Sequence, residues 1–184
     1  MKVIIGTPNT QQERRWRVDI LPDSAILRDG KPLFLPMTKA VPSLSASVAF
    51  RAGRLGKNIA PKFAPRYFDA FALCVRMSAT ADEDAFSAAE LSRFADNSLV
   101  VGDWTDLEGF DTTTASADIL STRLPFGVMM QRALTLMAEV SRFATIKMGD
   151  IVATDPIPLS PQPQPESIVT GRVNNIQKLR FRIK

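Results

Sequence analysis

The chain has 184 residues, of which 45% are hydrophobic and 23% charged, and this ordinary globular balance excludes a wholly disordered protein. Its formal charge of +4 comes from scattered basic residues without a recognised binding motif, which argues against a nucleic-acid partner. Histidine is absent, so the commonest general base at neutral pH and the commonest transition-metal ligand are both missing.

Cysteine use and hydropathy give expectations about the compartment. The single cysteine, Cys74, cannot form an internal disulfide, which favours a reducing environment. No run of 18 apolar residues occurs, and the apolar segment at residues 3–5 is too short for a signal-peptide core. We expect a cytoplasmic protein that does not bind membranes. We also expect one domain over residues 1–184, with an N-terminal strand and hairpin region at 1–40 and a core at 41–184.

The N-terminal region begins with a strand predicted at residues 2–5. Asp29-Gly30 is a strong turn signal between the apolar runs at residues 25–27 and 33–35, which predicts a hairpin. Glu13 lies in a polar stretch, where we interpret it as a solvated loop charge rather than a catalytic acid.

The next segment alternates apolar and polar residues, as a strand does. One face of this strand carries Val48, Phe50 and Ala52, and the other carries Ser45, Ser47, Ala49 and Arg51. A short helical segment is predicted within residues 61–68, where prolines limit its length. Residues 70–75 are continuously apolar, which predicts a strand buried on both faces with Arg76 at its exit.

Two helices are predicted in the second half of the chain. The sequence from Ser87 to Glu90 is a capping-box pattern that opens a short helix. Residues 126–144 carry an apolar stripe at three- and four-residue steps, and core packing is the favoured interpretation over a methionine-rich partner groove. The stripe consists of Val128, Met129, Ala133, Leu136, Met137, Val140 and Phe143.

The C-terminal region is predicted to be extended. Five prolines make residues 156–165 a connector, with a polyproline ligand as the alternative. Residues 167–173 and 177–183 are predicted to form two strands. Asn174-Asn175 is predicted to form the turn between them, because asparagine tolerates left-handed turn geometry.

Two short segments resemble the fumarylacetoacetate hydrolase family of divalent-metal enzymes, which act on oxo-acids by C–C hydrolysis, decarboxylation or isomerisation. They are R-L-G-K-N-I-A-P at residues 54–61 and R-Y-F-D-A at residues 66–70. The resemblance covers residues 18–78 and 122–184 well. It implies a mixed α/β fold, a β-roll of mainly antiparallel strands with peripheral helices, and a homodimer.

The resemblance also shows what the chain lacks. In the family a Glu-x-Glu pair and an Asp on the next strand hold the metal, and these positions are Ser45, Ser47 and Arg76 here. Mg²⁺ prefers charged oxygen ligands, so hydroxyls bind it poorly. A guanidinium at ~4 Å and an effective dielectric of ~20 would repel a divalent ion by roughly 8 kcal/mol. We therefore expect no cofactor, with neither Mg²⁺ nor Mn²⁺ bound.

Other family positions have changed as well. Leu21 and Gly102 stand where the family has lysines directed at the substrate, and Asp155 to Ile157 replace a Gly-Thr-Pro sequence. The aromatic wall is retained as Trp104, and Thr154 is also retained. The candidate site is thus a vestigial pocket without an assignable catalytic residue, formed by Ser45, Ser47, Arg76, Trp104 and Thr154.

These losses lead to three functional hypotheses. The first is a catalytically degenerate, non-enzymatic binding or regulatory homologue whose partner is an active family relative or a small carboxylate. The second is a hydrolase, decarboxylase or isomerase with a metal-independent site, in which Arg76 holds a substrate carboxylate and Ser45 or Ser47 hydrogen-bonds to it. The third is an interaction module that uses the proline connector or the basic termini. For Arg76, two placements stay open: an ion pair with Asp69, Asp82 or Glu83 near the surface, or the vacant metal pocket.

Overall fold

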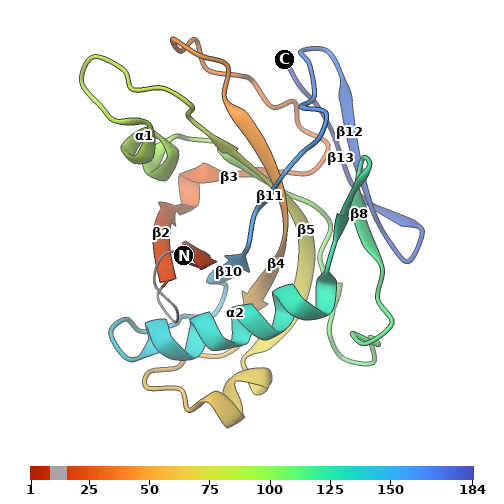
Figure 1. The fold of residues 1–184 in the computed structure, drawn as a ribbon. Coiled ribbons are helices and arrows are strands. Elements are labelled where there is room, and N and C mark those ends of the chain that lie inside the picture. The colour runs from red at the N-terminus through yellow and green to blue at the C-terminus, as the bar shows by residue number, and fades with distance from the viewer. Residues whose placement is uncertain (9–15) are drawn as a thin grey trace.

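The main feature of the computed structural model, which describes residues 1–8 and 16–184, is a curled nine-stranded sheet (Figure 1). The strand order is β2-β1-β10-β4-β5-β6-β3, with β7 added to β5 and β11 to β4. The strands are β1 (Lys2–Pro8), β2 (Trp16–Pro22), β3 (Ile26–Arg28), β4 (Ser43–Ala52), β5 (Phe68–Ser78), β6 (Leu99–Val101), β7 (Thr105–Asp106), β10 (Ile151–Thr154) and β11 (Ile157–Pro158).

The two outermost strands of this order are consecutive in the chain. The short 3-10 helix η1 (Asp23–Ala25) joins β2 to β3, so the sheet must bend round on itself to form a roll. The β1–β10 and β3–β6 pairs are parallel, and the other strand pairs in this sheet are antiparallel. The predicted fold class, a mixed α/β roll of mainly antiparallel strands, is confirmed.

A second sheet packs beside the roll, with the order β13-β12-β8-β9. Its strands are β8 (Ala117–Ile119), β9 (Thr122–Leu124), β12 (Ile168–Val173) and β13 (Ile176–Arg182). The helices are peripheral, and Figure 1 shows the longest one crossing the outer side of the roll. They are the 3-10 helix η2 (Pro61–Arg66), α1 (Ala88–Phe94) and α2 (Phe126–Ser141).

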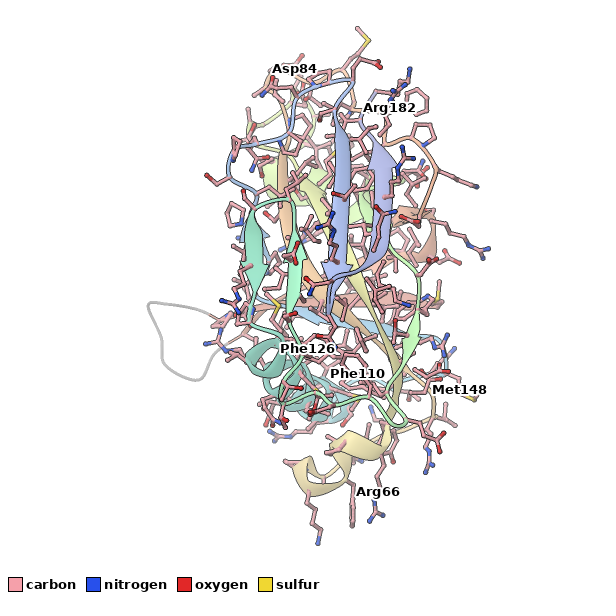
Figure 2. All side chains as sticks on the ribbon, turned by 90° about the vertical axis from the view of Figure 1, so that its right-hand side faces the viewer. Arg66, Asp84, Phe110, Phe126, Met148 and Arg182 are labelled. Atoms are coloured by element: carbon pink, nitrogen blue, oxygen red, sulfur yellow. The ribbon has the colours of Figure 1, made fainter. Side chains whose placement is uncertain are left out.

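The roll has an apolar layer on each side because alternate strand residues point to opposite faces. Outside, Phe50 and Phe71 pack against Phe126 at the start of α2, with ring centroids of Phe71 and Phe126 4.8 Å apart. Phe110 joins this cluster, and Figure 2 shows Phe110 and Phe126 beside α2. Inside, the roll is filled mainly by small and branched side chains, among them Val3, Ile5, Leu21, Ala49, Ala72, Cys74, Leu99 and Ala153.

Several predicted elements are confirmed. The capping box of α1 is formed, because Ser87 accepts from the backbone of Glu90 and the Glu90 side chain accepts in return. The C-terminal strands β12 and β13 meet at Asn174 and Asn175, both with positive φ. The proline-rich connector is extended, and part of it forms β11 against the edge of β4.

The predicted stripe of α2 is confirmed at its centre and wrong at its ends. Met129, Leu136 and Met137 are completely buried, whereas Val128 and Phe143 are 51% and 80% exposed. The helix ends at Ser141, so Phe143 lies beyond it and no longer follows the helical period.

The predicted hairpin around Asp29-Gly30 is wrong, although the two residues do form a turn. The first apolar run forms β3, which pairs in parallel with β6. In the second run, the Leu33 amide donates to the carbonyl of Arg182 in the smaller sheet. Each run therefore finds its partner in a different sheet. In contrast, the β8–β9 hairpin was not predicted, because its turn places Leu120 at φ 53°, a conformation that leucine rarely adopts.

No helix in the described ranges, 1–8 and 16–184, is both long and apolar enough to cross a membrane.

Candidate functional site

The serine face of β4 points into the roll. Ser45 lies directly opposite Arg76 on β5, and Ser47 lies opposite Cys74. The structure therefore brings together Ser45, Ser47 and Arg76, whose side chains start from adjacent positions on two neighbouring strands.

Arg76 lies within β5 rather than at its exit, and it is only 7% exposed. Its Nη2 donates to Oδ2 of Asp19 at 2.9 Å and to the carbonyl oxygen of Ser92 at 3.1 Å. The three acids expected as surface partners are not its partners. Among them, Asp69 binds Arg51 through two hydrogen bonds of 2.9 and 3.1 Å. Arg76 is thus a buried cation with a buried counter-ion.

Asp19, on β2, is the member of this cluster that the sequence did not reveal. It is 5% exposed and lies within 4 Å of three guanidinium groups. Arg76 Nη2 and Arg93 Nε are each 2.9 Å from a carboxylate oxygen, and Arg17 Nε is 3.9 Å away. Burial by itself raises the pKa of Asp19, but hydrogen bonds from Arg93 and Arg76 outweigh this and hold the pKa below its ordinary value of 3.8. The carboxylate therefore stays ionised and is a poor proton acceptor at neutral pH.

A cleft of about 430 Å³ opens beside this cluster, between β2, β5 and α1. The polar residues in its wall are Thr7, Arg17, Asp19, Arg76, Ser78 and Ser92. Ser45 and Ser47 do not line it. Ser47 is 2% exposed, and its Oγ donates to the carbonyl oxygen of Thr154 at 2.6 Å. The hydroxyl of Ser47 is thus engaged in the fold and does not face a ligand.

Thr154 and Trp104 lie away from this cleft. Thr154 is completely buried, and its Oγ1 donates to the carbonyl oxygen of Met129 in α2 at 3.2 Å. Trp104 lines a different cleft of about 490 Å³, where the Arg51 guanidinium lies 5.3 Å from its ring centroid. Arg76 in the cleft wall, Trp104 in the second cleft, and the buried Ser47 and Thr154 therefore occupy three separate environments.

The other positions at which the family resemblance implies a replacement have structural roles here. A β-carbon on Gly102 would lie 2.3 Å from the carbonyl oxygen of Lys178, so no side chain fits at this position. Leu21 is completely buried in the apolar interior. Asp155 has a φ of 51°, in the region that favours glycine, and forms an ion pair with Arg132, while Pro156 forms part of the cleft wall. None of these positions offers a group directed at a ligand in the manner that the family resemblance implied.

The residues of this cleft do not fit a divalent cation. Asp19 is the only carboxylate in the wall formed by described residues, and both of its oxygens accept hydrogen bonds from arginine. Within residues 1–8 and 16–184, no three His, Cys, Asp or Glu side chains are grouped closely enough to hold a metal ion. A divalent ion here would meet a fixed excess of positive charge instead of a set of anionic ligands.

Comparison with known proteins finds similarity in structure but not in sequence. No protein-family model matches the sequence, and no curated protein sequence matches it. A solved structure from Yersinia pestis, provisionally described as a fumarylacetoacetate hydrolase family protein, superposes with a TM-score of 0.75 at 18% identity. That alignment covers 100% of this chain and 92% of the other.

Two solved isomerases are similar to the same extent. The 2-hydroxyhepta-2,4-diene-1,7-dioate isomerase of Mycobacterium marinum gives a TM-score of 0.76 at 15% identity, covering 99% of this chain and 73% of the other. The 5-carboxymethyl-2-hydroxymuconate delta-isomerase of Mycobacterium smegmatis gives a TM-score of 0.75 at 15% identity, covering 99% of this chain and 78% of the other. The chain therefore has the fold found in fumarylacetoacetate hydrolase family proteins.

Proposed function

We propose that the chain is a degenerate member of the fumarylacetoacetate hydrolase family that no longer uses a divalent metal and acts as a non-enzymatic binding or regulatory protein. The observation that carries the proposal is the buried Arg76–Asp19 ion pair, with its 2.9 Å contact, at the place where the family resemblance puts a metal-binding carboxylate. A guanidinium keeps its charge at any working pH, so this position repels cations under all ordinary conditions.

The described part of the cleft also lacks the groups that a replacement mechanism would need. The chain has no histidine, Glu13 lies outside the described residues, and the single carboxylate in the described wall has a lowered pKa, so the described residues supply no general base poised near neutral pH. Ser47 donates its hydroxyl proton to a backbone carbonyl, which leaves no base positioned to activate it. These features support binding without turnover.

Activity measurements test this proposal directly. We expect neither acylpyruvate cleavage nor oxaloacetate decarboxylation above background when the full chain is supplied with Mg²⁺ or Mn²⁺. Turnover that depends on the added metal and disappears with EDTA would refute the proposal.

A metal-independent enzyme is the second candidate, and the persistence of a 430 Å³ cleft with an arginine in its wall favours it. Two of the structural neighbours are named isomerases, which would place an oxo-acid in that cleft. A screen of oxo-acids for turnover in the presence of EDTA separates the two candidates, because only the second predicts a product.

The proposal includes a cytoplasmic location and a homodimer. Light scattering coupled to size-exclusion chromatography should give a mass near twice 20.2 kDa. A monomer at micromolar concentration would contradict that part of the proposal without affecting the metal-free site.

A further inference from the structure

Three arginines converge on the Asp19 carboxylate, although one would neutralise its charge. Arg17, Arg76 and Arg93 all approach Asp19 within 4 Å, so these four side chains together carry a surplus of two positive charges, which the exposed Glu90 near Arg93 offsets only in part. Such a surplus in a partly buried position is unfavourable unless an anion shares it, because like charges in low dielectric repel strongly.

Arg76 has hydrogen-bonding capacity to spare. Both of its hydrogen bonds come from Nη2, and its Nε is buried without a partner among the residues that the structure describes. A buried donor of a charged group that lacks a partner costs free energy, so its retention at 7% exposure needs an explanation. A ligand oxygen in the adjacent cleft, whose wall Arg76 helps to form, would share the charge of this guanidinium.

Arg17 differs from Arg76 because it is free to move. Its side chain is 60% exposed, and its Nε contacts Asp19 only loosely at 3.9 Å. It can therefore turn toward a ligand without breaking a tight contact. Thr7 and Ser78 add hydroxyl groups to the same wall.

From these features we propose that the cleft between β2, β5 and α1 binds a small dianion through Arg17 and Arg76, while Arg93 holds Asp19 in place. The proposal deepens the proposed function, on which it rests, by naming the ligand class. Guanidinium groups pair with the oxygens of phosphates and carboxylates alike. The volume of about 430 Å³ suits a small molecule, and the two guanidinium groups of Arg17 and Arg76 in the wall favour a dianion over a monoanion.

Calorimetric titration at low ionic strength tests the proposal, because exposed charges are least screened there. The probes are inorganic phosphate, succinate and acetate, titrated into the full chain. We expect phosphate or succinate to bind in a 1:1 ratio, and acetate to bind at least about tenfold more weakly. Binding of phosphate alone identifies a phosphate-type ligand, and binding of succinate alone identifies a dicarboxylate. Absence of binding by both, or equal binding of acetate, would overturn the proposal.

Arg17→Gln is the diagnostic variant because Arg17 is exposed and its removal leaves the buried pair intact. We expect it to weaken dianion binding at least about tenfold. The matched control is Arg142→Gln, which removes an exposed arginine just after the end of α2 that pairs with Glu139 in the helix, and it should bind as the wild type does. An equal loss of dianion affinity in the two variants would show that binding depends only on the net charge of the protein, which would overturn the proposed site. If the wild type binds neither Mn²⁺ nor a dianion, this inference fails while the metal-free function stands.

Discussion

Removing the carboxylate of Asp19 should destabilise the protein far more than removing the arginine with which it pairs. The side chains of Arg76 and Asp19 are 8% and 7% exposed, so little water is available to either of them to replace a lost partner. Asp19→Asn leaves the Arg76 charge buried without compensation, which costs about 3–5 kcal/mol in comparable sites. For a chain of this size, that loss corresponds to a fall in Tm of about 6–20 °C.

The reverse change is milder because Asp19 has other partners. In Arg76→Met, Asp19 keeps the 2.9 Å contact from Arg93 and the looser one from Arg17, so we expect a loss of about 1–2 kcal/mol. In the double variant no buried charge remains without a partner. Its stability should therefore lie within about 1 kcal/mol of Arg76→Met alone, well above that of Asp19→Asn.

Equilibrium urea unfolding followed by tryptophan fluorescence measures all three variants. The matched control is Asp69→Asn, because the Arg51–Asp69 pair at the other end of the roll is partly exposed, with 34% and 44% of the side chains accessible. We expect that change to cost less than about 1 kcal/mol. The reasoning fails if Asp19→Asn costs no more than Asp69→Asn, or if the losses of Asp19→Asn and Arg76→Met simply add in the double variant.

Three further predictions follow from the same structure. The pKa of Asp19 is lowered in the folded protein, so its stabilising effect is complete above its ordinary pKa of 3.8 and is lost as the pH falls through the lower folded value. The stability difference between the wild type and Asp19→Asn should therefore narrow in acid titrations below about pH 4, and a constant difference would contradict this. Burial raises the pKa of Cys74 to about 12, so the thiol is not ionised at pH 8. Labelling of Cys74 with a thiol reagent at pH 8 should therefore be no faster than unfolding of the native chain, and it should go to completion in urea. Rapid labelling of the native chain would show that this part of the roll opens. Gly102→Ala places a β-carbon 2.3 Å from the Lys178 carbonyl oxygen, so it should lower the free energy of unfolding in urea by about 1–3 kcal/mol. A loss below about 0.5 kcal/mol would mean that the backbone of β13 shifts at little cost.

Local patterns in the sequence predict those elements whose hydrogen bonds are local. The capping box at Ser87 formed because its hydrogen bonds join residues only three apart. The asparagine turn at 174–175 formed as well, although Asn174 also exchanges hydrogen bonds with Ser116, 58 residues earlier. The Asp29-Gly30 turn also formed, yet the hairpin did not, because its flanking runs pair with strands far along the chain. Local turn signals do not specify such long-range partners.

The candidate site likewise combines local features that the sequence predicts with a long-range contact that it does not. Alternation along β4 predicts that Ser45 and Ser47 share one face, and the family resemblance implies that Arg76 lies beside them; in the structure Ser45 lies directly opposite Arg76. The partner of Arg76 lies 57 residues earlier in the chain, and nothing local distinguishes Asp19 from the other 18 acidic residues. Its inward position on β2, two residues before the buried Leu21, is the signal that strand alternation could have supplied.

Titration of Mn²⁺ into the full chain, with free Mn²⁺ followed by electron paramagnetic resonance, tests the proposed absence of a metal site most directly. With a guanidinium fixed against Asp19 at the position that the family resemblance compares with a metal ligand, the signal should rise as it does in buffer alone, up to the millimolar range. One Mn²⁺ bound per chain with micromolar affinity, and released by excess Mg²⁺, would contradict the claim that the chain uses no divalent metal.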